Sequence, residues 1–97
     1  MVRIIIHVLP EKQQEVLQTL LSLIEPSRKE QGCLSYGVFR NIEDEHILNV
    51  ISEWESSRHL ELYKSSDRFR VVLGTKSLLQ EPLKIQILTV QTNSNSR

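Results

Sequence analysis

The chain has 97 residues, which is enough for one domain and too few for two. Apolar residues make up 39% of it and charged residues 25%, the proportions of a globular protein rather than a disordered one. Twelve basic and twelve acidic side chains cancel, so the positive field typical of nucleic-acid-binding proteins is missing, and we expect no nucleic-acid partner.

The cysteine count and the N-terminal segment bear on the compartment. Cys33 is the only cysteine, so no disulfide can form within the chain, which favours a reducing environment. The apolar stretch Val2–Leu9 is interrupted by Arg3 and His7, and it is too short for a signal sequence or a membrane span. We therefore expect a cytoplasmic protein with no membrane partner.

The first predicted elements are a strand and a helix. Val2–Leu9 is rich in β-branched residues and stops at Pro10, which is typical of a buried strand. From Glu11 the apolar residues recur every three or four positions, which predicts a helix with one apolar stripe. Pro26 should kink or end this helix, and Gly32 should stop any further turn.

Three more strands are predicted from alternation of apolar and polar residues. Cys33–Asn41 and His46–Trp54 flank the polar segment 42–45 and so read as an antiparallel hairpin. Near the C-terminus, Leu83–Val90 alternates in the same way and predicts the last strand.

Two short helices are expected between the hairpin and the last strand. Ser57 is positioned to cap a helix over Arg58–Lys64. Ser66 is positioned to cap a second helix that begins at Asp67, and Gly74 should end it.

The element order is strand, helix, strand, strand, broken helix, strand. This order predicts an α+β domain of ferredoxin-like βαββαβ type, with a four-stranded antiparallel sheet over residues 1–91 and a polar, disordered tail over residues 92–97. Helices on one face of the sheet leave the other face bare, and an apolar bare face normally marks an interface. We therefore expect a homodimer formed through the open sheet face, with these apolar residues between the subunits: Ile5, Leu9, Ile47 and Ile51.

Common catalytic and ligand-binding motifs are absent from the sequence. It contains no GxGxxG, GxxxxGK[ST], GxSxG, HExxH or CxxC. His7, His46 and His59 are predicted on different elements and no ladder of acidic residues accompanies them, which makes a metal site improbable. We expect no metal and no cofactor.

Three segments read together resemble the antibiotic biosynthesis monooxygenase (ABM) domain family. They are residues 32–40 (GCLSYGVFR), residues 53–54 (EW) and Ser65–Phe69 (SSDRF). The resemblance implies a dimeric α/β barrel with one pocket per subunit between the sheet and its helices. Members of the family include cofactor-free oxygenases of polycyclic phenols and quinones, haem-degrading enzymes, and enzymes acting on small signalling metabolites.

Two positions differ from the family pattern in a way that bears on haem. Tyr63 stands where the resemblance places a histidine, and tyrosine is a much rarer haem ligand. Ile4 stands where the haem-degrading branch has an asparagine on the first strand. The resemblance therefore disfavours haem degradation for this chain.

The expected substrate-binding residues are apolar or aromatic. Trp54 ends its strand on the face that also carries Val50 and Ser52, so its indole can form a pocket wall that stacks on a flat substrate. Phe69 should point inward from the last helix and complete this set. The alternative for Trp54 is an ordinary core residue whose N–H finds one partner.

Tyr63 and His59 are the candidate catalytic residues. They are spaced i, i+4, so they share one face of a helix and can meet. Such a pair can deprotonate a phenol or hold a developing anion, since histidine titrates near neutral pH. The alternative is that the helix is too short to keep His59 out of solvent.

Three functions remain open from the sequence. The first is a cofactor-independent monooxygenase of a small planar phenolic or quinol-like substrate. The second is a non-catalytic dimeric module that binds a small apolar or aromatic molecule, which the replacement of the family histidine by Tyr63 favours. The third is an isomerase that uses the same pocket for proton transfer without oxygen.

Overall fold

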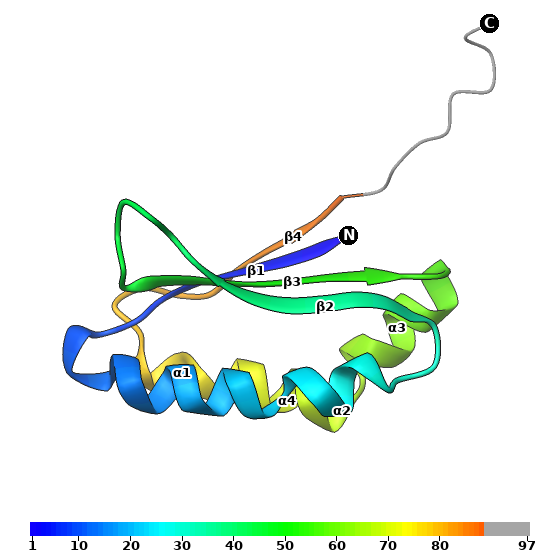
Figure 1. Cartoon of the computed structure of the whole chain (residues 1–97), viewed down its shortest axis with the longest axis horizontal. Helices are drawn as coiled ribbons and strands as arrows, with labels where there is room; N and C mark the ends of the chain where they lie inside the picture. The colour runs from blue at the N-terminus through cyan, green and yellow to red at the C-terminus, as the bar shows by residue number, and fades with distance from the viewer. Residues whose placement is uncertain (89–97) are drawn as a thin grey trace, which may run out of the picture.

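The computed structural model describes residues 1–88 (Figure 1). Four strands and four helices follow one another in the predicted order, joined by two short 3-10 turns over Pro10–Lys12 and Thr75–Leu78. The elements are β1 (Val2–His7), α1 (Gln13–Ser22), α2 (Ile24–Arg28), β2 (Cys33–Arg40), β3 (Ile47–Trp54), α3 (Ser57–Lys64), α4 (Asp67–Gly74) and β4 (Lys84–Ile87).

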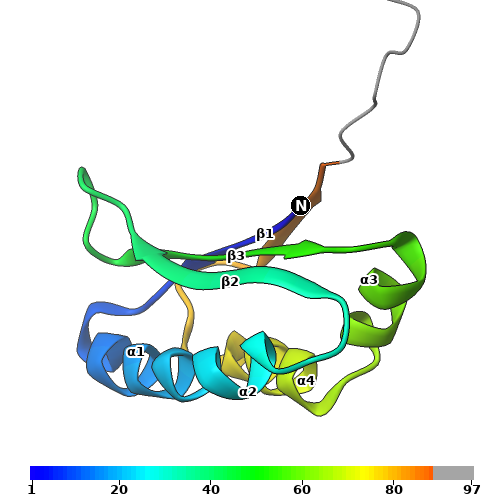
Figure 2. The ribbon, with the colours of Figure 1, turned by 45° about the vertical axis from the view of Figure 1, so that its right-hand side comes forward.

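The sheet is antiparallel throughout, with strand order β2-β3-β1-β4. All four helices lie in one layer against one face of the sheet, and the opposite face is uncovered (Figures 1 and 2). The predicted ferredoxin-like α+β fold is confirmed. Within residues 1–88, no helix has both the length and the apolar character needed to cross a bilayer.

The core lies between the sheet and the helices. Strand β1 contributes Val2, Ile4 and Ile6, each at most 1% exposed. Their partners across the β1–β3 ladder are Ser52, Val50 and Leu48, which are also buried. Because side chains of a strand alternate between its faces, this register also turns Trp54 toward the helices, as the sequence predicted.

The uncovered face mixes apolar and polar side chains: Lys84 and Gln86 lie on it opposite Ile5 and Arg3, and Glu53 follows Ile51 on β3. Ile5, Ile47 and Ile51 lie on it and are half-buried by their neighbours on the sheet. In their midst, the Arg3 side chain donates a hydrogen bond from Nε to Asn49 Oδ1 over 2.9 Å. Three of the four apolar residues predicted for this face are therefore on it, whereas Leu9 lies past the end of β1, at the cap of the 3-10 turn Pro10–Lys12.

Two helix boundaries differ from the prediction. The first helix breaks at Leu23, three residues before Pro26, because a proline nitrogen cannot donate to the carbonyl four residues earlier and its ring collides with that carbonyl. Helix α3 is capped by Ser56 and not by Ser57: the Ser56 side chain accepts a hydrogen bond from the His59 amide.

Gly74 is the last residue of α4, as predicted, but it does not reverse the chain. It keeps a right-handed helical φ of −66°, and the chain continues into the 3-10 turn Thr75–Leu78. Gly32 is the other glycine that was predicted to stop a helix. Its φ is +82°, in the left-handed region that lets the chain reverse after a helix. The last strand occupies Lys84–Ile87, and residues 89–97, including the end of the predicted strand and the predicted tail, lie outside the described part of the chain.

Candidate functional site

Trp54 stands at the end of β3 and is held by two contacts. Its indole Nε1 donates to Ser52 Oγ at 2.9 Å, a bond that alternation along the strand makes available because the two residues share a face. One face of the indole stacks on the ring of Tyr63, with 4.7 Å between centroids and 22° between planes. The tryptophan is thus fixed in orientation while still half-exposed.

Tyr63 is the centre of an aromatic cluster. It lies on α3, is 1% exposed, and makes edge contacts with Tyr36 at 6.2 Å and Phe69 at 5.3 Å between ring centroids. Its hydroxyl is buried and, among the described residues, has no hydrogen-bond partner. Burial raises the pKa of Tyr63 far above its ordinary value, and the neighbouring Tyr36 and Cys33 add to the rise. The phenol is therefore neutral and cannot act as a base near pH 7.

His59 is held at the N-terminus of the same helix. The Ser56 hydroxyl lies 2.7 Å from His59 Nδ1 and also accepts the His59 backbone N–H at 3.3 Å. The imidazole lies directly on Gly32, where the methyl group of an alanine would overlap His59 Cγ. His59, for which solvent exposure was the alternative to a catalytic role, is thus packed on Gly32 and hydrogen-bonded to Ser56.

A cavity of about 290 Å³ brings three of the predicted site residues together. We call it the histidine cavity. Its lining includes Trp54, His59 and Tyr63, together with Leu62 on α3, Ser66 just after it, and Glu30 from the turn between α2 and β2. Leu62 is 57% exposed, so the cavity is bordered by residues at the protein surface.

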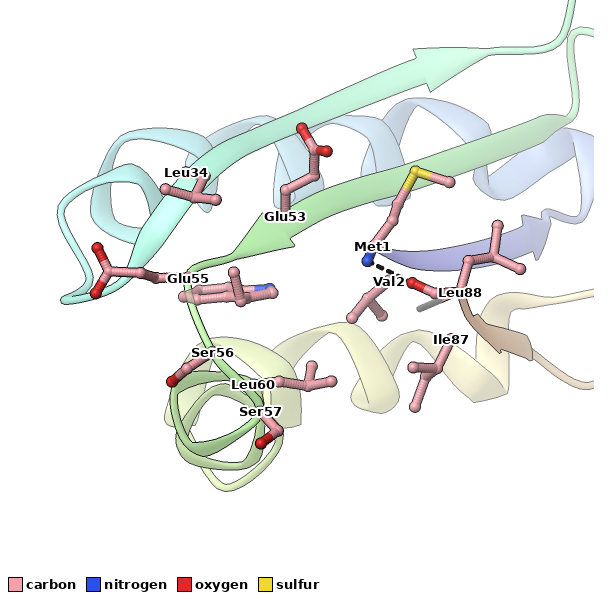
Figure 3. Close-up of a pocket in the computed structure, with 11 residues that line it drawn as sticks. Met1, Val2, Leu34, Glu53, Glu55, Ser56, Ser57, Leu60, Ile87 and Leu88 are labelled. Atoms are coloured by element: carbon pink, nitrogen blue, oxygen red, sulfur yellow. Dashed lines mark hydrogen bonds between the residues drawn. The ribbon is translucent and has the colours of Figure 1, made fainter. Parts of the chain in front are cut away.

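A second cavity, of about 380 Å³, lies where the ends of β1, β3 and β4 approach α3 (Figure 3). We call it the terminal-strand cavity. Leu60 and Ile87 project into this region from α3 and β4. Its apolar lining consists of Val2, Leu34, Trp54, Leu60, Ile87 and Leu88. Trp54 lines both cavities, so it stands between them.

The other predicted substrate-binding residues lie behind this surface. Val50 and Ser52 are at most 1% exposed in the sheet, and Ser52 acts as the acceptor for the Trp54 indole. Phe69 is 7% exposed and packs behind Tyr63. Neither cavity is lined by any of the three. Ser52 supports Trp54 and Phe69 supports Tyr63 from within the core.

Several lining residues were not foreseen from the sequence. Val2 and Ile87 reach the terminal-strand cavity because they pair with each other across β1 and β4. The alternation of Leu83–Val90 placed Ile87 on the inward face, but a single sequence does not reveal which residue of β1 it pairs with.

Two histidines predicted to lie apart are brought together by a loop carboxylate. Asp44 lies 3.6 Å from His7 Nε2 and 3.5 Å from His46 Nδ1, and Glu81 lies 3.6 Å from His7 Nδ1. The sequence did not predict that these carboxylates lie beside the two histidines. Across residues 1–88, no group of three or more His, Cys, Asp or Glu side chains is arranged to hold a metal ion.

A comparison with models of protein families shows to which family the chain belongs. The family model described as "Antibiotic biosynthesis monooxygenase" matches residues 1–73, most of the chain. The chain belongs to this ABM family. The matched range includes the strand that ends in Trp54 and the helix that carries His59 and Tyr63.

Individual relatives agree with this assignment. "Putative monooxygenase YcnE" of Bacillus subtilis is 30% identical over 81 residues, which cover 82% of this chain and 85% of the relative. A conserved protein from Methanosarcina mazei has a crystal structure that is similar with a TM-score of 0.78 and 33% identity, covering 88% of this ABM chain and 87% of its own. Rv0793 from Mycobacterium tuberculosis has the same fold, with a TM-score of 0.85 at 20% identity over 96% and 95% of the two chains.

Proposed function

We propose that this ABM-family protein is a monooxygenase of a small planar phenolic or quinol-like substrate and works without metal, flavin or haem. The observation that carries the proposal is the histidine cavity, where an aromatic wall and a histidine side chain line the same cavity. Trp54 supplies the wall, and His59 supplies the titratable group.

The size of the cavity supports a small ligand. Drug-sized ligands occupy pockets of roughly 300–1,000 Å³, and the histidine cavity, at about 290 Å³, lies at the lower end of this range. A compact aromatic ring with one or two hydroxyl groups suits this volume. Its apolar part would contact Trp54 and Leu62, and its oxygen would face His59.

The chemistry requires little from the protein beyond binding and control of one proton. Loss of a proton from the substrate yields an electron-rich anion that can itself reduce oxygen. For a ring with a reactive CH₂ group, both C–H bonds break, one oxygen atom becomes the new carbonyl, and the other leaves as water. The substrate supplies all the electrons, so the site must favour its anion and exclude competing water.

The two candidate catalytic residues take different parts in this proposal. His59 would interact with the substrate oxygen, because it lines the cavity and carries ring nitrogens of variable protonation. Tyr63, neutral and buried, would brace Trp54 through their stack and act at most as a hydrogen-bond donor.

A homodimer is part of the proposal. The uncovered sheet face carries half-buried Ile5, Ile47 and Ile51, and a two-fold partner placed there would remove them from water. A chain this short buries a modest fraction of its own surface, so this burial would add stability that one subunit lacks. The single cysteine is consistent with a cytoplasmic protein.

The alternative is a non-catalytic module that binds a small apolar or aromatic molecule. The specific observation in its favour is that Tyr63 replaces the family histidine and presents no free polar group: its hydroxyl is buried. An isomerase would use the same cavity and His59 for proton transfer alone.

Oxygen consumption distinguishes these functions. We expect purified protein to accelerate oxygen uptake with an anthrone or a simple hydroquinone, and the variant His59→Gln to slow this by about 100-fold. Saturable binding of the same compounds without oxygen uptake would contradict the oxygenase and favour the binding module. Conversion of the ring compound without oxygen uptake would favour the isomerase.

A further inference from the structure

The hydroxyl of Ser56 makes two contacts with a single residue. It accepts the backbone N–H of His59 at 3.3 Å, the ordinary task of a helix N-cap, and it lies 2.7 Å from Nδ1 of the same residue. A serine hydroxyl has one proton to donate and two lone pairs to accept with. The direction of the second bond therefore decides which nitrogen of the imidazole carries the proton.

Two features favour Ser56 as the donor in this second bond. A separation of 2.7 Å is central for a hydroxyl donor but at the short end for a nitrogen donor. The hydroxyl also accepts a peptide N–H, and a hydroxyl polarised in this way becomes a stronger donor. With Nδ1 as acceptor, a neutral imidazole must carry its proton on Nε2.

The rest of the ring is constrained by Gly32. Cβ, Cγ and Cδ2 of His59 all lie within 2.7 Å of where a Gly32 side chain would begin. With Nδ1 held by Ser56 and Cβ, Cγ and Cδ2 nearest to Gly32, the remaining ring atoms are Cε1 and Nε2. The nitrogen that is not bonded to Ser56 therefore carries the N–H group, in a side chain that lines the histidine cavity.

We infer that Ser56 is a positioning residue that holds His59 as the Nε2–H tautomer, so that His59 serves the histidine cavity as a hydrogen-bond donor to an anionic oxygen. The part that concerns the substrate rests on the proposed function. When a phenol binds, its O–H bond breaks, the proton passes to water at the open side of the cavity, and the oxyanion accepts from Nε2–H. His59 remains neutral throughout.

Nitrogen NMR of the imidazoles tests this directly. Long-range ¹H–¹⁵N spectra at pH of about 8.5, above the ordinary titration range of histidine, distinguish the two tautomers and the imidazolium. The chain has three histidines, and the signals lost in His59→Gln identify His59. We expect the Nε2–H tautomer in the free protein and an unchanged neutral signature after saturation with 4-nitrophenol, whose phenolate is read from its visible absorbance.

Substitutions at Ser56 test the positioning role without unfolding the helix. Ser56→Gly keeps a residue that helix N-caps accept but removes the hydroxyl, and Ser56→Thr restores it. We expect the glycine variant to bind the phenolate at least about threefold more weakly and the threonine variant to recover the affinity. Ser57→Gly makes the same change at the next position, outside the histidine cavity, and should leave the affinity within about twofold.

The outcomes separate this inference from the proposed function. An Nδ1–H tautomer in the free protein, an imidazolium in the complex, or no binding of 4-nitrophenol would overturn the inference. Equal phenolate affinity in Ser56→Gly and the parent would also overturn it. If the NMR and binding results are as expected but no compound is oxygenated, Ser56 retains its role and the oxygenase proposal fails.

Discussion

The imidazole of His59 lies on the backbone of Gly32, so closely that any side chain at position 32 would occupy the same space. Gly32 ends the turn before β2, whereas His59 lies on α3, and the contact joins two segments that are 27 residues apart. The carbonyl group of Gly32 also accepts a hydrogen bond from the backbone N–H of Glu55 at 2.8 Å. Gly32 therefore supports the candidate site through its contacts with His59 and Glu55.

Gly32→Ala should destabilise the protein by about 2 kcal/mol or more. Its φ of +82° costs an L-residue roughly 1–2 kcal/mol, and the new methyl group must displace His59. Gly74→Ala is the control, since φ there is −66° and nothing lies within 4 Å of the added carbon. That change should stabilise the helix by about 0.5–1 kcal/mol. Urea unfolding measures both, and equal effects would contradict the Gly32 contact.

Alkaline unfolding should depend on Tyr63. Burial raises the pKa of Tyr63 above its ordinary value, so the unfolded chain loses this proton near pH 10 while the folded chain keeps it. The folded state then binds more protons than the unfolded state, and stability falls as pH rises above about 10, by up to about 1.4 kcal/mol per pH unit. Below that pH, Tyr63 contributes nothing to the dependence of folding stability on pH.

The variant Tyr63→Phe isolates this effect. It keeps the ring that stacks on Trp54 and removes a buried hydroxyl that has no partner in the described part of the chain, so stability near pH 7 should be unchanged or slightly higher. The difference between parent and variant should appear only above pH 10, by urea unfolding at pH 8 to 11. If the stabilities of the parent and Tyr63→Phe changed in parallel with pH up to pH 11, the burial of the hydroxyl would be refuted.

Ligand binding can be assigned to one of the two cavities. Trp54 is the only tryptophan, so its fluorescence reports directly on a ring bound beside it. Leu62→Glu replaces an exposed apolar wall of the histidine cavity, and Ile87→Glu does the same in the terminal-strand cavity. We expect the first change to weaken the binding of 1-naphthol about tenfold and the second to have little effect. The reverse order would place the ligand in the terminal-strand cavity.

Ile51→Lys should dissociate the proposed homodimer. Ile51 lies near the middle of the uncovered sheet face, where a buried and unpaired ammonium group would cost several kcal/mol. Leu21→Lys is the matched control, because Leu21 is 50% exposed on α1, in the helical layer on the other side of the sheet. Sedimentation velocity at micromolar concentration should show dimers for the parent and Leu21→Lys and monomers for Ile51→Lys. A monomeric parent would refute the dimer.

Local sequence patterns were sufficient to predict the fold and three residues of the histidine cavity, Trp54, His59 and Tyr63. Alternation placed Trp54 and Ser52 on the helix-covered face of β3, and the i, i+4 spacing placed His59 and Tyr63 on one side of α3. These inferences need only the period of a single element. They identified the residues that the histidine cavity brings together.

Contacts between distant segments could not be predicted from such local patterns. No local pattern indicates that Gly32 meets His59, that Asp44 lies between His7 and His46, or that Tyr63 covers one face of Trp54. Each depends on how two elements dock, which is decided by packing over the whole core. The exact helix cap, Ser56 instead of Ser57, depended on a one-residue choice between equivalent side chains.

The two ends of the described chain meet beside the larger cavity. The Met1 ammonium donates to the Leu88 carbonyl at 2.7 Å, and both residues line the terminal-strand cavity (Figure 3). Any residues joined ahead of Met1, such as an affinity tag, would replace this ammonium with a peptide bond and begin at the cavity rim. Binding assays should therefore compare protein produced with and without such an extension, because an attached peptide would reach the terminal-strand cavity and alter the surroundings of Trp54, which lines both cavities.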